Sequence, residues 1–249
     1  MQLIRNLNPN DKIWRYTDFP KFLDMLMSNS LFFSKLSKLQ DPHEGKITHY
    51  DLQTENDGVE YLKSKWGEPW AEITGDATPE RHKEQTKLRK NTIVNCWHLN
   101  NHESTIMWKL YSNYNYRISI QSTVKRLDDS IQYKDFPVEI RSIKYLDWTK
   151  EGVGKNQIFD EQLYVKRLSF KHEKEIRAII RSNFTYSNSQ LKLRLNKDGK
   201  LIPANLDLLI EKIFVSPFAK SWFFKLVKAV IIQYLPNKEV IQSNYLTLR

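Results

Sequence analysis

The stretch IWRYTDFPKFLDMLMSNSLFFS, residues 13–34, predicts a strand, a helix and a second strand in direct succession. Residues 13–16 are mostly β-branched or aromatic, which is typical of a strand. Thr17 or Asp18 can cap the following helix, and Pro20 lies in its first turn, where the missing N–H costs no hydrogen bond. The last four residues return as a strand. Apolar residues recur at helical spacing between the two strands, at Phe19, Phe22, Leu23 and Leu26.

Outward from this stretch, strand patterns outnumber helix patterns. They do not alternate strictly with helices, which disfavours a doubly wound parallel sheet. The sequence therefore predicts an α+β fold with a mixed or antiparallel central sheet and flanking helices. We expect strands at 92–97, 116–121, 138–145, 175–181, 212–215 and 240–243, and helices from about 102 and at 219–234.

The segment 45–91 differs in character from the rest of the chain. It is rich in charges and in glycine and proline, and it holds few aliphatic residues, too few for a core of its own. Helices are expected at 59–66 and 79–90. We interpret the chain as a single domain, 1–249, in which 45–91 is a polar insertion or a lid.

Composition excludes several classes of protein. The 249 residues include 7 glycines, and none falls in a GxGxxG or GxxxxGK[ST] pattern, which argues against a Rossmann site or a P-loop. The single cysteine excludes a disulfide within the chain and suits a reducing cytosol, so we expect a cytoplasmic protein without a membrane span. The net charge of +10 is compatible with a nucleic-acid partner or with a merely basic surface.

A metal site or a thiol nucleophile would need a tighter pattern than the chain offers. Asp41, His43 and Glu44 form a compact cluster, and His98 and His102 are four residues apart, but no general base lies between the two histidines. We expect no metal, and keep a metal-dependent nuclease using Asp41, Glu44, Glu103 and the histidines as an alternative. Cys96 and His98 can share a strand face, yet a free cysteine is more often a buried apolar residue.

Glu173 and Glu175 are the most suggestive carboxylates. Their spacing of two places them on one face at a strand edge. Two carboxylates on one face repel, which raises the pKa of one and suits it to acid–base work or to stabilising a cationic transition state. The structural alternative is a surface strand in which Glu173 or Glu175 pairs with Lys171 or Arg177.

Arg15 is the second candidate, because it lies between Trp14 and Tyr16. An arginine beside aromatic rings can hold a phosphate while a ring stacks on a base. The alternative is an arginine at the rim that stacks on its neighbours.

The order of several short blocks resembles the bacterial "domain of unknown function 2971" family. The match runs through most of the chain and concerns family membership rather than activity. The blocks are Ile13-Trp14-Arg15-Tyr16, Leu31-Phe32-Phe33-Ser34, Asp41-Pro42-His43-Glu44-Gly45, Cys96-Trp97-His98, Glu103-Ser104 with Met107-Trp108-Lys109-Leu110-Tyr111, Ile118-Ser119-Ile120-Gln121-Ser122 and His172-Glu173-Lys174-Glu175-Ile176-Arg177.

At a second level the chain is similar to the ADP-ribosyltransferase fold, whose members carry an Arg or His, a Ser, Thr or Tyr, and a Glu on successive core strands. Arg15, Ser34 and Glu175 occur in that order. The resemblance implies that Arg15 holds a phosphate or ribose of NAD, Ser34 supports the nicotinamide pocket, and Glu175, with Glu173 beside it, stabilises an oxocarbenium-like transition state. Tyr16, Trp97 and His98 complete the residues that we expect to contact NAD.

The resemblance favours an NAD-consuming, ADP-ribosyltransferase-like protein, with nucleic acid as a candidate acceptor and a toxin or phage-defence setting. Two other hypotheses stay open. One is a non-catalytic nucleic-acid-binding or regulatory module in which Arg15, Trp97, Trp108 and the lysines contact phosphates and bases. The other is the metal-dependent nuclease.

Overall fold

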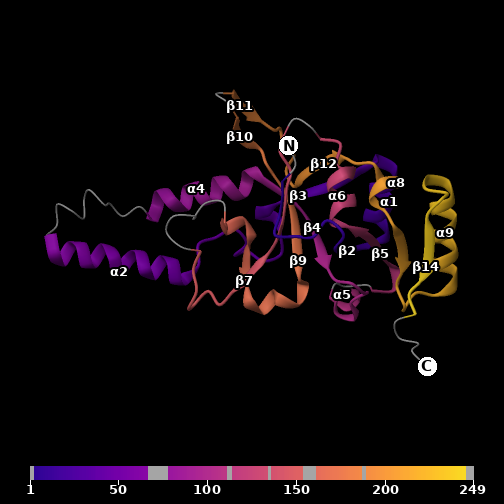
Figure 1. Ribbon diagram of the computed structural model, residues 1–249, viewed down its shortest axis with the longest axis horizontal. Coiled ribbons are helices and arrows are strands. Elements are labelled where there is room, and N and C mark those ends of the chain that lie inside the picture. The colour runs from indigo at the N-terminus through magenta and orange to yellow at the C-terminus, as the bar shows by residue number, and fades with distance from the viewer. Residues whose placement is uncertain are drawn as a thin grey trace.

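The computed structural model describes residues 3–66, 78–110, 114–133, 136–153, 161–186 and 189–244. In this part of the chain a ten-stranded mixed sheet is flanked by helices (Figure 1), which confirms the predicted fold class. Eight strands follow one path, in the order β1 (Leu3–Arg5), β6 (Glu139–Ser142), β9 (Glu175–Arg181), β4 (Thr92–Leu99), β2 (Lys12–Asp18), β5 (Arg117–Thr123), β13 (Lys212–Val215) and β14 (Glu239–Gln242).

The predicted strand–helix–strand stretch forms β2, α1 (Phe19–Ser28) and β3 (Ser30–Lys35). The Asp18 carboxylate accepts a hydrogen bond from the Lys21 N–H at 2.9 Å and so caps α1, with proline in the first turn. Asn29 ends the helix in the left-handed conformation, with φ 46°. The predicted cap and both strands are confirmed.

The sheet divides at β4. One edge of β4 pairs with β9 along most of its length, from Thr92↔Arg181 to His98↔Glu175. The other edge is shared, because β2 pairs with its end at Trp14↔His98 and β3 pairs near its start at Ser34↔Val94. A further strand, β12 (Gly199–Pro203), adds to β3. The strands β2 and β3, which follow each other in the sequence, therefore pair with opposite ends of the same edge of β4.

One face of the sheet, here called the helical face, is apolar. Residues alternate between faces along a strand, and Ile13, Trp97, Ile120 and Ile176 all belong to one buried cluster on this side. The cluster also takes apolar residues from α1, α6 (Val124–Ser130), α8 (Leu206–Leu209) and α9 (Ser221–Tyr234). These helices supply the main hydrophobic core.

The opposite face, here called the site face, carries His98, Glu175 and Arg177 of the same strands. His98 and Glu175 lie opposite each other in the β4–β9 register, one residue along from the Trp97↔Ile176 pair of the helical face. The segments over this face are short. They include α5 (Thr105–Lys109), η3 (Gln162–Tyr164), the parallel pair β7 (Lys144–Leu146) and β8 (Val165–Arg167), and η4 (Leu168–Glu173).

The predicted polar insertion contains two helices, α2 (His49–Trp66) and α4 (Thr78–Asn91), which extend away from the sheet at one end of the molecule (Figure 1). The α2 helix is longer than the predicted 59–66. Its role as a lid stays a prediction, and residues 67–77 lie outside the described residues. None of the helices in the described ranges is both long and apolar enough to cross a membrane.

Two predicted elements differ from the structure. The strand expected at 138–145 is two strands, because β6 pairs with β9 while β7 turns away to pair with β8. The helix expected from His102 begins at Thr105, since the Ser104 hydroxyl accepts from the Met107 N–H and caps it there. The short hairpin of β10 (Asn183–Tyr186) and β11 (Ser189–Lys192) was not predicted.

Candidate functional site

The two predicted carboxylates meet at the start of β9. Glu173 is the last residue of η4, Lys174 takes the left-handed conformation with φ 39°, and Glu175 is the first residue of the strand. The sequence predicted both carboxylates on one strand edge. In the structure Glu173 precedes the strand and only Glu175 lies on it. The turn at Lys174 lets both side chains reach the same cation, the Lys166 ammonium of β8.

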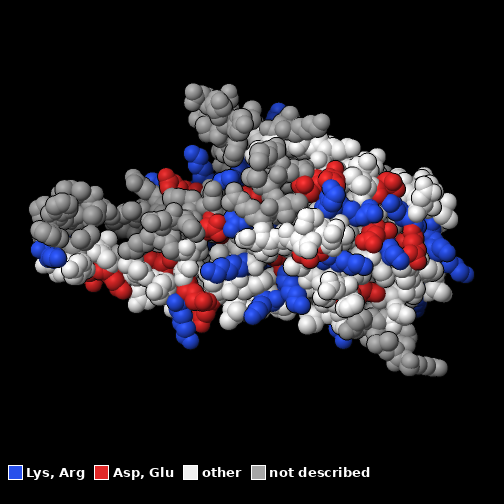
Figure 2. Space-filling model, viewed as in Figure 1, with Lys and Arg blue, Asp and Glu red and all other residues white. Residues whose placement is uncertain are grey.

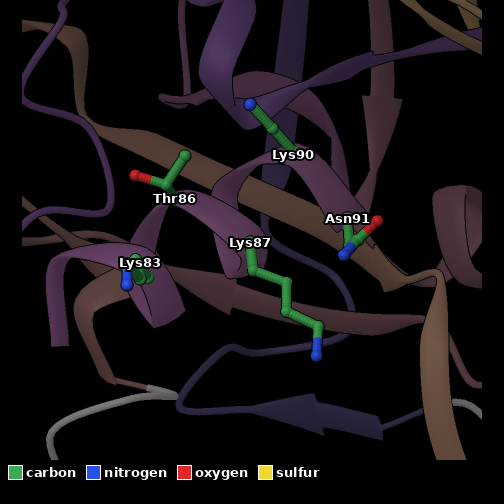
Figure 3. A pocket seen from close by; sticks show the side chains of 5 residues that line it. All are labelled: Lys83, Thr86, Lys87, Lys90 and Asn91. Carbon is green, nitrogen blue, oxygen red and sulfur yellow. The ribbon is translucent and has the colours of Figure 1, made fainter. Parts of the chain in front are cut away.

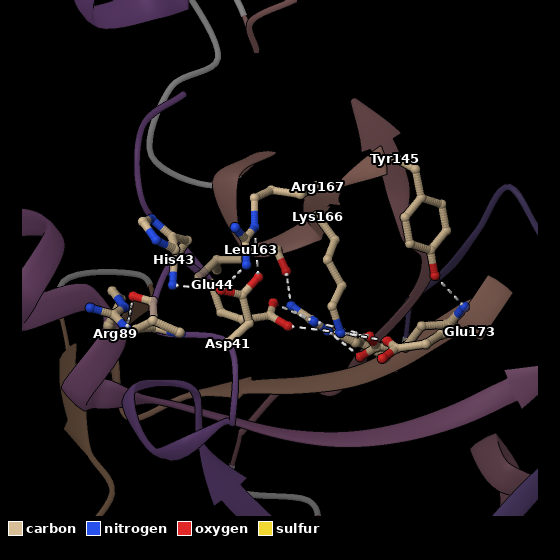
Figure 4. Close-up of polar contacts among 12 residues, drawn as sticks. Asp41, His43, Glu44, Arg89, Tyr145, Leu163, Lys166, Arg167 and Glu173 are labelled. Atoms are coloured by element: carbon tan, nitrogen blue, oxygen red, sulfur yellow. Dashed lines mark hydrogen bonds and ion pairs between the residues drawn. The ribbon is translucent and has the colours of Figure 1, made fainter. Parts of the chain in front are cut away.

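Three carboxylates and two cations form one group, here called the charge cluster, in which all but the half-buried Glu173 are buried (Figure 4). The Lys166 Nζ lies 3.0 Å from Glu44 Oε1, 2.5 Å from Glu173 Oε2 and 3.2 Å from Glu175 Oε2. The Arg177 guanidinium bridges the other side, with Nε 2.5 Å from Glu175 Oε1 and Nη2 2.5 Å from Glu44 Oε2. The structural alternative of a Glu175–Arg177 pair is thus confirmed, and the pair is buried rather than on a surface strand.

Glu44 is positioned in this cluster by the loop Asp41-Pro42-His43-Glu44-Gly45. Gly45 has φ 69°, a conformation that costs glycine little, and the Asp41 carboxylate accepts from the His43 N–H at 3.0 Å. Asp41 also pairs with Arg167 at 2.9 Å, and Arg89 of α4 donates to the Pro42 carbonyl at 3.1 Å. The loop is therefore fastened to β8 and to α4.

Glu173 and Glu175 differ in the direction in which their pKa values are shifted. Burial raises the pKa of Glu175, but the charges of Arg177 and Lys166 outweigh burial and lower it to about 2. Burial also raises the pKa of Glu173, and Lys166 offsets this only in part, while Glu175 adds repulsion. One carboxylate is firmly ionised and its neighbour takes a proton more readily, which is a division suited to acid–base chemistry.

The lowered pKa of Glu175 predicts acid sensitivity. In the unfolded state the carboxyl has its ordinary pKa of 4.5, so between that pH and about 2 the unfolded state binds more protons than the folded state. The contribution of this group to stability is therefore lost as pH falls through that window. We expect Glu175→Gln to show a shallower loss of unfolding free energy than the wild type over this range. Urea unfolding at several pH values measures both slopes, and equal slopes would contradict the assignment.

His98 borders the cluster. Its Nδ1 lies 2.6 Å from the carbonyl oxygen of Glu173, and because a carbonyl only accepts, Nδ1 carries the proton. Nε2 is then the acceptor nitrogen of the neutral ring, and it is buried without a hydrogen-bond partner in the described part of the chain. Burial lowers the pKa of His98, which keeps the ring neutral. This nitrogen can accept a hydrogen bond or a proton from a ligand.

Aromatic side chains stand next to His98 on the site face. The Tyr16 ring lies 6.2 Å from the His98 ring and 5.0 Å from the Trp108 ring, between centroids, and is edge-on to both. The Tyr16 hydroxyl accepts from the Ser104 N–H at 2.7 Å, and Trp108 Nε1 donates to Glu103 at 3.0 Å. The predicted residues Tyr16 and His98 therefore lie together, beside Glu173 and Glu175.

Arg15, Trp97 and Ser34 are not brought to this point. Arg15 pairs with Ile120 in the β2–β5 register, and Trp97 pairs with Ile176, so both belong to the helical face. Ser34 pairs with Val94, four residues before His98 on β4, or about 13 Å along the strand. The expectation that Arg15, Ser34 and Glu175 form one site is therefore corrected. Glu175 belongs to the group on the site face, Ser34 lies apart from it, and Arg15 and Trp97 form a separate pair on the helical face.

Arg15 is unusual in its surroundings. Its guanidinium carbon lies 5.8 Å from the centre of the Trp97 ring, which agrees with the expected stacking. Nη1 is shielded from solvent and has no hydrogen-bond partner among the described residues. Burial lowers the pKa of Arg15. A shielded cation without a counter-charge is costly, and an anionic ligand group would offset the cost.

The carboxylates that the nuclease hypothesis names as metal ligands have other partners in the structure. Asp41 pairs with Arg167, Glu44 with the cations of the charge cluster, and Glu103 with Trp108. Within the described ranges no group of three or more His, Cys, Asp and Glu residues could hold a metal ion. Each carboxylate that this hypothesis names as a ligand therefore already contacts a different protein partner.

Cys96 lies on the site face, opposite Arg177 in the register. Burial and the neighbouring Glu175 raise the pKa of its thiol well above the usual value. A thiolate is the nucleophilic form, so this environment disfavours a Cys96–His98 nucleophile.

No protein-family model and no curated protein matches the chain, so membership of the "domain of unknown function 2971" family stays a prediction. Among solved structures, DarT of Thermus sp. 2.9 in complex with NAD+ matches at 10% sequence identity, covering 97% of this chain and 99% of that chain, with a TM-score of 0.40.

Proposed function

We propose that the chain is an ADP-ribosyltransferase-like enzyme that consumes NAD at the charge cluster. The observation that carries this proposal is the pair of adjacent carboxylates at the start of β9, of which Glu175 stays ionised while Glu173 holds a proton more readily. Beside them, the acceptor nitrogen of His98 has no protein partner in the described part of the chain. A fixed negative charge and a proton acceptor are what glycosidic-bond transfer requires.

The chemistry assigns one task to each group. The bond between the ribose C1′ and the nicotinamide nitrogen breaks with its electron pair going to nicotinamide, which leaves neutral. The positive charge that develops on the ribose is stabilised by Glu175. The acceptor then forms its bond to C1′ and gives up a proton, which Glu173 takes. His98 accepts a hydrogen bond from a hydroxyl or amide of the substrate, and the rings of Tyr16 and Trp108 offer surfaces beside it.

Arg15 is proposed to hold an anionic part of NAD, because its shielded guanidinium has no counter-charge among the described residues. Arg15 and Glu175 belong to opposite faces of the sheet, so they cannot act on the same atom of the substrate. In NAD one ribose separates the diphosphate from the glycosidic bond that breaks, so Arg15 and Glu175 would contact different parts of the same molecule. Removing Arg15 should therefore affect binding, whereas removing Glu175 should affect turnover.

A nucleic acid is the proposed acceptor class. The net charge of +10 favours a polyanion, and nucleic acids offer hydroxyl and ring-nitrogen nucleophiles. Lys and Arg are interspersed with Asp and Glu on the face shown in Figure 2, so the acceptor surface has to be sought locally rather than over that whole face. A toxin or phage-defence setting is the one that the family resemblance implies.

Arg15→Met tests the proposed division of tasks. The variant removes a half-buried cation whose Nη1 is shielded from solvent, and it keeps an unbranched side chain in its place, so we expect unchanged or higher stability without NAD. We expect KM for NAD to rise about 10- to 100-fold, the loss of one or two charge-assisted hydrogen bonds, with kcat within about threefold. Nicotinamide release measured over a range of NAD concentrations separates the two constants.

The control for Arg15→Met is Arg126→Met. Arg126 also loses a guanidinium, but at an exposed position where it donates to the Leu208 carbonyl. We expect KM and kcat of this control to equal those of the wild type. Unchanged KM in Arg15→Met would assign Arg15 to stacking on Trp97 alone. Absence of nicotinamide release in the wild type, with and without nucleic acid, would overturn the proposed function.

A further inference from the structure

The α4 helix carries a row of lysines outside the charge cluster. Lys83, Lys87 and Lys90, together with Thr86 and Asn91, line an open groove of about 480 Å³ (Figure 3). The five residues come from successive turns of one helix, at spacings of three and four that place them on one side. This set is called the lysine groove below.

The lysine groove forms no ion pair that the structure describes, although Glu84 lies three residues before Lys87 on the same helix. Many lysines elsewhere pair with a carboxylate, as Lys125 does with Asp129 at 2.8 Å and Lys212 with Glu239 at 2.8 Å. Lys83, Lys87 and Lys90 form no ion pair within the described ranges. Three like charges on adjacent turns repel one another, which costs stability unless an external anion neutralises them.

The opposite side of α4 fixes the helix to the body. Gln85 is buried, with its amide 3.4 Å from Gln162, and Leu88 packs against the cluster that contains Leu36 and Val94. Arg89 donates to the Pro42 carbonyl, next to the loop that delivers Glu44. The lysine side therefore stays available at a fixed position, linked through that loop to the charge cluster.

We propose that the lysine groove binds the phosphodiester backbone of one nucleic-acid strand. From Lys83 to Lys90 the helix rises about 10 Å, at about 1.5 Å per residue. A strand carries one phosphate per about 3.4 Å along a duplex axis, so the row of lysines spans about three phosphate steps, and each ammonium group can contact one phosphate. Thr86 and Asn91 add a hydroxyl and an amide, which donate to phosphate oxygens.

This inference takes only its partner class from the proposed function, since a groove can bind a strand whether or not the charge cluster consumes NAD. Its test is the binding of short fluorescein-labelled oligothymidylate and oligouridylate, measured by anisotropy over a salt series with the full chain. The variant is Lys83→Gln/Lys87→Gln/Lys90→Gln. The matched control is Lys220→Gln/Lys225→Gln/Lys228→Gln, which removes the same charge around α9, at the other end of the molecule in Figure 1.

Three phosphate contacts predict a salt slope of about −2 in a plot of log affinity against log salt, at about −0.7 per contact for a single strand. The groove variant should lose that slope and bind about 100-fold more weakly near 0.1 M salt. The control should stay within about threefold of the wild type. Preference for one labelled strand over the other then distinguishes DNA from RNA.

Two results would overturn the inference. Equal losses in the groove variant and in the α9 control would mean that net charge alone attracts the strand. Binding of polyglutamate with the same affinity as the oligonucleotides would mean that the groove takes an acidic polypeptide. NAD consumption without nucleic acid, measured in the same variant, should be unchanged, so a failure of the groove is distinguishable from a failure of the proposed function.

Discussion

Arg177→Met is expected to lower the free energy of unfolding by about 3–5 kcal/mol, the cost of removing one partner from a buried ion pair. Arg177 is fully buried and contacts both Glu44 and Glu175, so its removal leaves only Lys166 to balance three carboxylates. Nη1 also donates to the Leu163 carbonyl at 3.0 Å, and that acceptor is left unpaired. Chemical unfolding measures the change directly.

The control for this prediction is Lys21→Met. Lys21 pairs with Asp18 at 2.7 Å, but its side chain is 79% exposed, so the pair contributes at most about 1 kcal/mol. For a chain of this length the Arg177 variant should unfold about 6–20 °C below the wild type. A midpoint within about 2 °C of the wild type would mean that Arg177 is not the main counter-charge of Glu44 and Glu175.

Glu175→Gln is expected to reduce nicotinamide release by at least about 100-fold, the usual cost of removing one electrostatic contact to a developing charge. The glutamine oxygen still accepts from Arg177, so the fold is retained. Loss of the Glu175 charge also removes one cause of the raised pKa of Glu173, which eases ionisation of Glu173 and keeps the cluster balanced. Initial rates at saturating NAD measure the effect.

Glu161→Gln is the matched control, because Glu161 pairs with Arg141 at 2.8 Å away from the charge cluster. It should release nicotinamide at the wild-type rate. If Glu175→Gln keeps its rate while folding normally, then Glu175 serves only as the counter-charge of Arg177 and Lys166, and the proposed catalytic role is refuted.

Much of the fold was predictable because its signals are local. The cap at Asp18, the alternation in β5 and the apolar run of β9 each depend on neighbouring residues, and each element forms close to its predicted bounds. The break between β6 and β7 was not predictable from local sequence. It depends on the pairing of β7 with β8, in which Lys144 pairs with Val165, twenty-one residues later in the chain. The division of the sheet at β4 likewise depends on long-range pairing.

The site was predictable only in part. The spacing of Glu173 and Glu175 marks them as a pair, while Tyr16 and His98 are expected NAD contacts only through the family resemblance, and the four residues lie together in the structure. Lys166 was missed, because nothing near it in the sequence marks a lysine that reaches Glu44. The sequence offered the Asp41–Glu44 block a role only as metal ligands, because its partners Arg167 and Arg177 lie more than a hundred residues away. The face on which Arg15 lies depends on register, which residue types do not reveal.

The most direct test of NAD consumption at the charge cluster is calorimetric titration of NAD into the wild type and Glu175→Gln, with nicotinamide measured in each sample afterwards. We expect saturable binding by both proteins in the range of about 1 μM to 1 mM, with nicotinamide released by the wild type alone. Absence of both binding heat and nicotinamide in the wild type at millimolar NAD would contradict this expectation.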